Sequence, residues 1–420
     1  MLPEIVAMHA RSGTVALNVV TAALDADDAT RGITVHFAKH EREMTSALRE
    51  ASARTVALWS FYSPDLEAVK KDLAAVRDGT RDRDVIHVAG GVHATAEPLA
   101  TLRAGFDLVA LGEGESTIIA LVRTIAGGGD PRALTGIAHL DDGGRLVSHG
   151  PGERAELDRF PAFNVRYRKW NALEITRGCV YACSFCQTPY MFKARFRHRS
   201  IANVRAHVEE MKKSGSRFVR FLTPTSLSYG AEGTEPNLDA VEELLANVRE
   251  AAGPEAKIYF GTFPSEIRPE HVSERALAIL AKYIDNKTLV IGGQSGSERI
   301  LEATRRGHGV DDVVRAVKLA VAAGFEPDVD FLLGLPDEEE EDRKASIRLA
   351  EELVALGARI HSHAFMPLPG TPLRDAIPTP IEPETKRTME RLESRGAAYG
   401  QWRRQVITAN DLVRARRASP

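Results

Sequence analysis

Short apolar runs alternate with helical patterns along almost the whole chain, and this alternation restricts the fold more than any other feature. In the first 150 residues, three apolar runs predict buried strands, at 55–60, 84–89 and 107–111. Glycines follow two of these runs, at Gly90-Gly91 and at Gly112. Strand–helix alternation with glycine after the strands is typical of a doubly wound parallel sheet. We therefore predict an α/β, Rossmann-like domain over residues 1–150, closed by a small hairpin between 133 and 147.

A second alternating region follows a polar connector at 150–171. Its apolar runs predict six strands, at 172–176, 218–223, 257–264, 288–293, 326–333 and 360–366. Six βα units of this size are typical of a partial (βα)6 barrel of the TIM type, which we place at 165–375; sites on such barrels lie at the carboxyl ends of the strands. Residues 376–420 form a C-terminal basic extension. Its charge favours a solvated, partly helical tail or a docking face for an acidic partner.

The overall composition excludes several functional classes. Hydrophobic residues make up 43% and charged residues 27%, and the formal net charge is −3. This balance gives no indication of binding to nucleic acid or to an anionic membrane surface. The chain has no run of about 18 apolar residues and no basic region followed by an apolar run at its start. We therefore expect a cytoplasmic protein without a membrane span or signal peptide.

All three cysteines of the chain, Cys179, Cys183 and Cys186, lie directly after the predicted strand 172–176. An odd, clustered set is a poor disulfide framework. Cys183 and Cys186 alone would suit a thioredoxin-like redox pair, but that leaves Cys179 unexplained. Three thiolates favour an iron–sulfur cluster in which one iron has no protein ligand. The alternative is structural zinc, which needs a fourth ligand such as His198.

The segment Cys179-x3-Cys183-x2-Cys186, with Phe185 before the last cysteine, resembles the signature of the radical S-adenosylmethionine (SAM) superfamily. The resemblance implies that the cysteines hold a 4Fe–4S cluster whose open iron chelates SAM, and that Phe185 contacts the adenine. In that family, reduction of the cluster cleaves SAM to methionine and a 5′-deoxyadenosyl radical, which abstracts hydrogen from the substrate. A low-potential electron donor of the ferredoxin or flavodoxin type is then the expected partner.

Further segments with family landmarks extend the resemblance over about 170–375. The fourth predicted strand resembles the segment that contacts the ribose and carboxylate of SAM, and the fifth resembles the segment that passes the adenine. The SAM-contacting candidates on them are Gln294, Ser295, Leu332 and Gly334. After the second strand the chain departs from the family, because it lacks the usual glycine- or acid-containing segment. Thr223 and, after the third strand, Ser265 are the candidates there.

Joined to this barrel, the N-terminal domain resembles the cobalamin-binding domain of one radical SAM subgroup. The matching positions, all near strand ends, are Ser60, Gly90, Gly91, His93, Gly112 and Glu113. Glycine at such positions lets the backbone approach a large flat ligand closely. The Asp-x-His-x-x-Gly motif that supplies a cobalt-ligating histidine in other cobalamin proteins is absent, so the resemblance implies cobalamin bound without a protein histidine.

The leading hypothesis is a cobalamin-dependent radical SAM enzyme that methylates an unactivated carbon. The alternatives are a radical SAM rearrangement, cyclisation or oxidation without cobalamin, and a non-catalytic metal-binding scaffold. A methylthiotransferase resembles this layout but would need further cysteines in its first domain. His361 and His363 alternate on the sixth strand, so both face one side, as substrate ligands, proton donors or core histidines. The sequence identifies no substrate.

Overall fold

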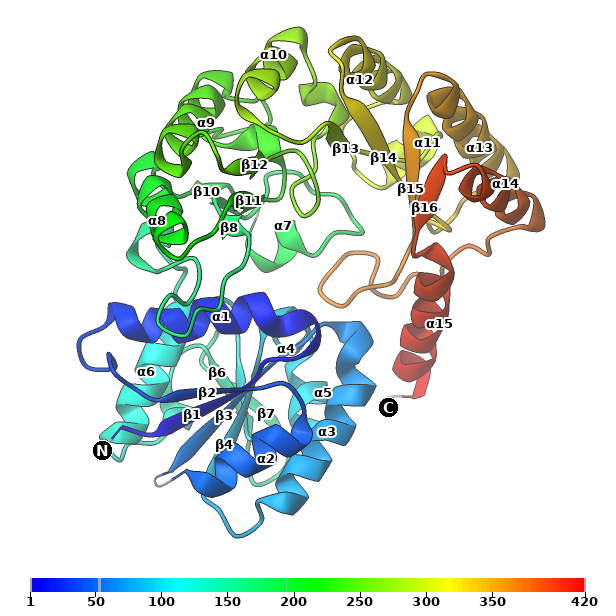
Figure 1. Cartoon of the computed structure of the whole chain (residues 1–420). Coiled ribbons are helices and arrows are strands. Elements are labelled where there is room, and N and C mark those ends of the chain that lie inside the picture. Colours follow the sequence, from blue (N-terminus) through cyan, green and yellow to red (C-terminus); the bar gives the residue numbers. More distant parts are fainter. Residues whose placement is uncertain (1, 52–53, 194, 419–420) are drawn as a thin grey trace. The chain divides into compact units, whose positions relative to one another are not determined.

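The computed structural model describes residues 2–51, 54–193 and 195–418 and divides into two compact units, Met1–Asn171 and Ala172–Pro420 (Figure 1). The connector at 150–171 belongs to the first unit, because Ala155 and Phe160 are buried in its core. No helix in the described part of the chain has the length and apolar character needed to cross a membrane.

The first unit is the predicted α/β domain. Its elements are β1 (Glu4–Met8), α1 (Thr14–Ala23), β2 (Val35–Ala38), α2 (Glu41–Glu50), β3 (Thr55–Ser60), α3 (Leu66–Gly79), β4 (Val85–Gly90), α4 (Gly91–Ala96), α5 (Pro98–Arg103), β5 (Leu108–Ala110), α6 (Glu115–Ala126), β6 (Ile137–Leu140) and β7 (Leu146–Ser148). The seven strands form one sheet in the order β2-β1-β3-β4-β5-β6-β7. β1 to β5 are parallel, and the expected hairpin β6–β7 adds an antiparallel edge.

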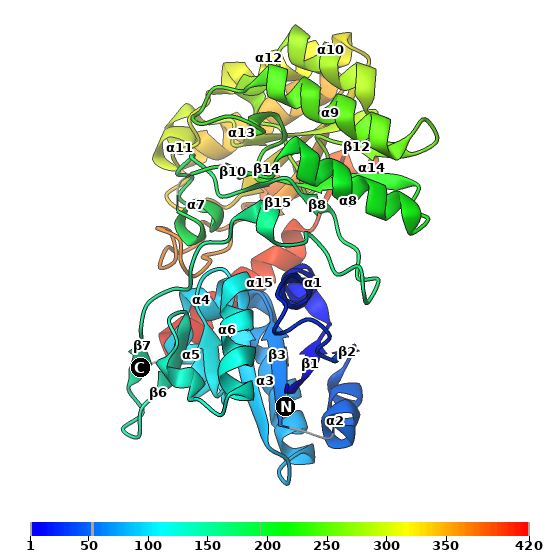
Figure 2. The same ribbon diagram turned by 90° about the vertical axis from the view of Figure 1, so that its left-hand side faces the viewer.

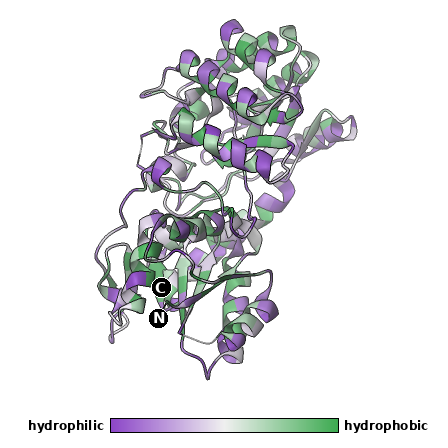
Figure 3. Cartoon of the chain, turned by 60° about the vertical axis from the view of Figure 1, so that its left-hand side comes forward, coloured by the Kyte–Doolittle hydropathy of each residue, from purple (hydrophilic) through white to green (hydrophobic). Residues whose placement is uncertain are grey.

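Side chains that alternate along the strands build a separate core on each face of this sheet. Ile5, Val56 and Leu58 pack with apolar residues of α1 and α6. Val6, Ala57 and Trp59 point the other way and pack with α2 and α3. Strands buried on both faces are rich in apolar residues, as the hydropathy colouring in Figure 3 shows. The doubly wound layering follows from this alternation and is visible in Figure 2.

The second unit is a partial barrel. Its elements are β8 (Leu173–Glu174), β9 (Thr176–Arg177), α7 (Thr188–Met191), β10 (Arg197–His198), α8 (Ile201–Lys213), β11 (Phe218–Leu222), α9 (Leu238–Ala252), β12 (Lys257–Tyr259), α10 (Glu274–Tyr283), β13 (Thr288–Gln294), α11 (Glu298–Ala303), α12 (Val310–Ala322), β14 (Glu326–Leu333), α13 (Glu340–Ala355), β15 (Arg359–Ala364), α14 (Pro383–Ser394), β16 (Ala398–Gly400) and α15 (Trp402–Ala418).

Strands at all six predicted positions are present, and consecutive ones run parallel. β8, β11 and β12 form one sheet, and β13 to β16 form another. A parallel bridge between Ile267 and Ile291 links the segment after β12 to β13. β12 is shorter than predicted because at Phe260 the backbone bonds to a side chain and not to a neighbouring strand. The Asn286 side chain accepts a hydrogen bond from the Phe260 N–H and donates one to the Phe260 carbonyl, each at 3.0 Å.

The basic extension differs from the solvated tail that its charge suggested. β16 adds a seventh strand, parallel to β15. Met389, Leu392 and Trp402 are buried and share a core with β14 and β15. The basic residues of α14 and α15 alternate with these apolar ones, which makes both helices amphipathic. A count of charges alone does not detect this pattern.

Candidate functional site

The cysteine loop leaves the barrel where the first strand ends. β9 pairs antiparallel with the short strand β10, with Arg177 opposite Arg197. Gly178 follows with a positive φ of 81°, and a Cβ there would lie 2.0 Å from the carbonyl oxygen of Arg195. The loop therefore requires glycine at this position, both for its backbone conformation and for the close approach of the two chain segments.

Burial and repulsion between neighbouring sulfurs favour the neutral form of the Cys179 and Cys186 thiols when no cation balances them. Cys183 is buried, and Cys179 and Cys186 are half-buried. Burial, with a smaller contribution from the other two cysteines, raises the pKa of Cys179 to about 12 and also raises the pKa of Cys186. The buried Arg306 guanidinium donates from Nη1 to Cys183 Sγ at 3.5 Å. The thiolates of Cys179 and Cys186 thus need a positively charged partner, which a metal cluster supplies.

The donor set fits a cubane cluster better than zinc. Tetrahedral zinc at its usual 2.3 Å bond length brings sulfur ligands to about 3.8 Å from one another. Among the described residues, the one group of three that offers ligand atoms within 4.8 Å of one another does not involve the cysteines, so their sulfurs are more widely spread. His198 is no fourth ligand, because Nδ1 bonds to Thr176 Oγ1 and Nε2 to the Ala231 carbonyl, both at 2.9 Å.

An apolar cluster lies beside the cysteine loop. Phe185 and Leu332, both predicted to contact SAM, pack against the same buried group of Ile300, Leu335 and Phe365. Gly334 has a positive φ of 74°, and a Cβ there would lie 2.7 Å from the Thr379 carbonyl oxygen. Position 334 therefore requires glycine, because any side chain there would collide with the segment that follows β15.

The side chains predicted to make polar contacts with SAM lie at or after the carboxyl ends of β11, β12 and β13, and three of them make hydrogen bonds within the protein. Thr223 Oγ1 donates to the Thr225 carbonyl at 3.1 Å. Ser265 bonds to Ser226, with 3.1 Å between the hydroxyl oxygens. Gln294 has a positive φ of 69°, and Ser295 Oγ lies 3.3 Å from Ser346 Oγ. Thr225 Oγ1, by contrast, is buried and has no hydrogen-bond partner in the described structure.

Three charged residues of this region are not among the predicted SAM-contacting residues: Glu266, Arg306 and Asp330. Arg306 Nη2 donates to the Gly292 carbonyl at 2.7 Å, which joins the cysteine loop to β13. Burial raises the pKa of both Glu266 and Asp330. Asp330 Oδ1 also lies 2.7 Å from Nδ1 of His361. The parallel register of β14 and β15 sets Asp330 opposite His361.

The candidate cobalamin positions gather at the carboxyl edge of the first unit's sheet. The order of the strands in the sheet reverses between β1 and β3, and ligands of doubly wound sheets bind at such a point. Ser60 ends β3 in contact with Gly91, whose φ is 86° and whose Cβ would lie 2.6 Å from Ser60 Oγ. Gly90 and Gly112 end or follow the neighbouring strands β4 and β5. This edge of backbone and small side chains fits a large flat cofactor.

The other two candidates there are anchored within the unit. His93 is 3% exposed; Nδ1 lies 2.9 Å from Ser63 Oγ, and burial lowers its pKa to about 4. Its Nε2 is buried and has no hydrogen-bond partner among the described residues. Glu113 Oε2 accepts from the Ala155 N–H at 3.0 Å, so this carboxylate fixes the connector.

Two family profiles match the chain. The one described as "Radical SAM superfamily" matches residues 173–350, and the one described as "B12 binding domain" matches residues 8–122. Together they cover the strands and loops that carry the cysteines and the glycine-rich sheet edge.

Curated relatives are similar over part of the chain. A tRNA-2-methylthio-N(6)-dimethylallyladenosine synthase of Psychrobacter arcticus is 30% identical over 221 residues, which cover 51% of this chain and 42% of the relative. A putative methylthiotransferase of Methanocaldococcus jannaschii is 26% identical over 298 residues, covering 68% and 62%. The match thus spans less than two thirds of either relative.

Two solved structures share the fold. The cobalamin-dependent SAM radical enzyme OxsB, with aqua-cobalamin and SAM bound, gives a TM-score of 0.66 at 16% identity and covers 83% of this chain and 52% of its own. The radical SAM methyltransferase TsrM of Kitasatospora setae, with cobalamin and a [4Fe-4S] cluster bound, gives 0.67 at 17% identity and covers 89% and 74%.

Proposed function

Because the chain belongs to the radical SAM superfamily and carries an N-terminal B12-binding domain, we propose that it is a methyltransferase acting on an unactivated carbon. Its cofactors are a 4Fe–4S cluster, SAM and cobalamin. The observation that carries the proposal is the presence, in one chain, of a three-cysteine loop at a barrel strand end and a glycine-rich edge on a doubly wound sheet.

The residues of the barrel have separate roles in this proposal. When bound, the cluster would supply the electron that cleaves SAM, and cobalamin would carry the transferred methyl group. Cys179, Cys183 and Cys186 hold the cluster, and Phe185 and Leu332 offer an apolar surface to the adenine. The polar contacts to SAM come from Thr223, Ser265, Gln294, Ser295 and the backbone at Gly334.

The first unit would hold cobalamin at the carboxyl edge of its sheet. The backbone exposed to cobalamin there would be that of Ser60, Gly90, Gly91 and Gly112. His93 and Glu113 would hold the neighbouring segments in place through hydrogen bonds to Ser63 and Ala155. The electron would come from a low-potential donor of the ferredoxin or flavodoxin type, since radical SAM enzymes need a reductant.

Methylthiolation is the second candidate, because the relatives above are named as methylthiotransferases. The cysteine count argues against it. All three cysteines lie between Cys179 and Cys186, which leaves no thiol in the first unit to hold a second cluster. A product that gains the mass of a methylthio group, rather than a methyl group, would establish methylthiolation instead.

The test uses the full chain, reconstituted anaerobically with iron, sulfide and cobalamin and then reduced with dithionite. We expect 5′-deoxyadenosine and S-adenosylhomocysteine to form from added SAM, and neither to form above background in Cys183→Ala. 5′-Deoxyadenosine alone, from protein that stays colourless after cobalamin loading and desalting, would favour rearrangement, cyclisation or oxidation. Neither product would contradict catalysis and favour the scaffold.

A further inference from the structure

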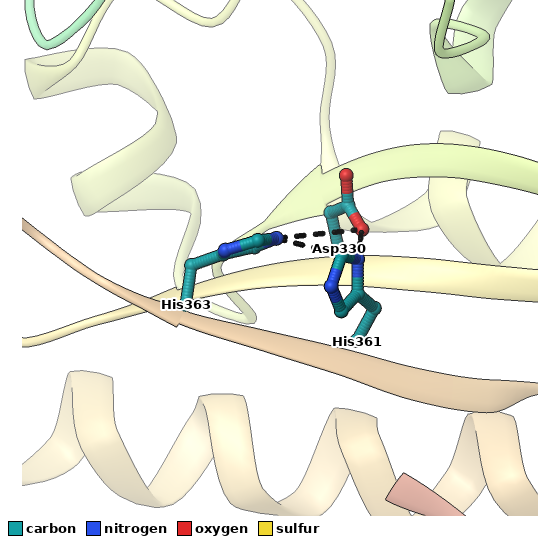
Figure 4. Close-up of side chains that lie close together, drawn as sticks. All are labelled: Asp330, His361 and His363. Carbon is teal, nitrogen blue, oxygen red and sulfur yellow. Dashed lines mark hydrogen bonds and ion pairs between the residues drawn. The ribbon is translucent and has the colours of Figure 1, made fainter. Parts of the chain in front are cut away.

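Asp330, His361 and His363 bring three possible metal-ligand atoms together on one face of β14 and β15 (Figure 4). Parallel register sets Asp330 opposite His361, and His363 lies two residues further along β15. The adjacent residues Phe331 and Ile360 point the other way and pack in the core with residues of the helices. Because strand side chains alternate, the aspartate and both histidines point to the opposite, inner face.

The three atoms are spaced as ligands of one ion would be. Asp330 Oδ1 lies 2.7 Å from His361 Nδ1 and 4.0 Å from His363 Nε2, and the two nitrogens are 3.3 Å apart. A circle through these three points has a radius of about 2.0 Å, which is the usual distance from zinc to histidine nitrogen or carboxylate oxygen. At its centre a cation would have Asp330 and His363 nearly opposite each other, so a tetrahedral ion requires these two ligand atoms, now 4.0 Å apart, to approach by about 0.7 Å.

Hydrogen bonding alone accounts less well for this arrangement. The short contact between Asp330 and His361 is a hydrogen bond that needs a single proton. His363 Nε2 then faces a ring nitrogen and a carboxylate oxygen at 3.3 and 4.0 Å, which are long for hydrogen bonds. A single cation would engage a lone pair from all three groups at once.

We propose that Asp330, His361 and His363 form a second metal site, for a divalent first-row transition metal of the zinc or iron(II) class. Two imidazoles with one carboxylate suit these borderline metals better than Mg²⁺ or Ca²⁺. Three protein ligands leave coordination positions open, as in catalytic rather than structural sites. Those positions face the inner side of the barrel strands, where they would take an oxygen-bearing group of the substrate, such as a carboxylate, carbonyl or hydroxyl.

The surrounding side chains hold the ligands in place. The Tyr399 ring stacks on His361 with the centroids 4.5 Å apart. Gln405 accepts from the Ala364 N–H at 2.8 Å through Oε1, and its Nε2 lies 3.3 Å from His363 Nδ1. Metal at His363 Nε2 places the ring proton on Nδ1, so the Gln405 amide must turn its oxygen to that ring. A carboxylate at position 405 would accept both N–H groups without turning.

Zinc binding to the cluster-loaded full chain tests the proposal. With iron and sulfide occupying the cysteines, the protein is treated with chelator, desalted and dialysed against zinc, and zinc is counted per chain by elemental analysis. We expect about one zinc per chain in the wild type and none in His361→Ala/His363→Ala. His36→Ala, at a half-exposed histidine on β2, should keep the zinc. Changes to groups that orient metal-ligating histidines shift affinity by about 10- to 100-fold, so Gln405→Glu should bind zinc at least about tenfold more tightly.

Three results would overturn the metal site: no zinc in the wild type after dialysis, equal zinc in the double variant, which would mark an adventitious ion only, or unchanged affinity in Gln405→Glu. Asp330→Asn, of the same shape, should also lose zinc. Iron content and thermal unfolding establish that each variant is folded. The readout is independent of methyl transfer, so failure of either proposal leaves the other intact.

Discussion

Substituting Gly178 by alanine should damage the cysteine loop far more than the same change at another glycine with similar backbone geometry. Gly178 and Gly215 have φ values of 81° and 88°. A Cβ at Gly178 would meet the Arg195 carbonyl oxygen at 2.0 Å, whereas a Cβ at Gly215 has nothing within 4 Å. Left-handed backbone costs a non-glycine residue about 1–2 kcal/mol. Overpacking adds about 1–3 kcal/mol at Gly178 alone.

We therefore expect Gly215→Ala to lose about 1–2 kcal/mol and Gly178→Ala about 2–5 kcal/mol. Each kcal/mol lowers Tm by about 2–4 °C in a unit of this size. Because the clash displaces the backbone next to Cys179, Gly178→Ala should also bind less iron and sulfide after reconstitution, while Gly215→Ala binds as much as the wild type. Equal cluster content and equal Tm in the two variants would refute this account of the loop.

Three further predictions concern the cluster, the pH dependence of stability and the cobalamin edge. Arg306→Gln removes a positive hydrogen-bond donor from Cys183, so the cluster's reduction potential should fall in an EPR-monitored titration; an unchanged potential would contradict the contact. Burial raises the pKa of Glu338 from 4.5 to about 7. The folded state therefore binds more protons in this window, and stability falls as pH rises from about 4.5 to 7. Glu338→Gln should weaken that fall in denaturant midpoints, and an identical pH profile would count against it. Gly91→Ala should lower cobalamin loading, measured by corrinoid absorption after desalting. Adding Ser60→Ala removes the clash but not the backbone strain, so it should restore loading only in part; full loading of Gly91→Ala would show that the edge is not used.

Much of the fold could be predicted from the sequence because its strands are buried on both faces. Such strands are continuous apolar runs, as at 55–60, which become β3 unchanged. β16, Ala-Tyr-Gly, has no such run and is a strand only because β15 offers it an open edge. The burial of α14 and α15 was not predicted because their apolar side chains are interspersed with basic ones. Such an amphipathic helix has a low mean hydropathy although one of its faces is apolar.

Site residues that lie close together in the sequence could be predicted, whereas those brought together from distant segments could not. The cysteines and Phe185 form one short segment, so their pattern is readable from the sequence. Arg306 reaches Cys183 across 123 positions of the chain. Asp330 meets His361 only through strand register, which periodicity alone does not determine. Both contacts join residues that lie far apart in the sequence.

The central claim is that SAM methylates a carbon by way of cobalamin bound to this chain. The most direct test adds SAM with an isotopically labelled methyl group to the reduced protein, loaded with both cluster and cobalamin. The corrinoid is then extracted in the dark for mass spectrometry. Cobalamin-dependent methyl transfer predicts labelled methyl on the corrinoid. Unlabelled corrinoid from protein that retains cobalamin and cleaves SAM would contradict it.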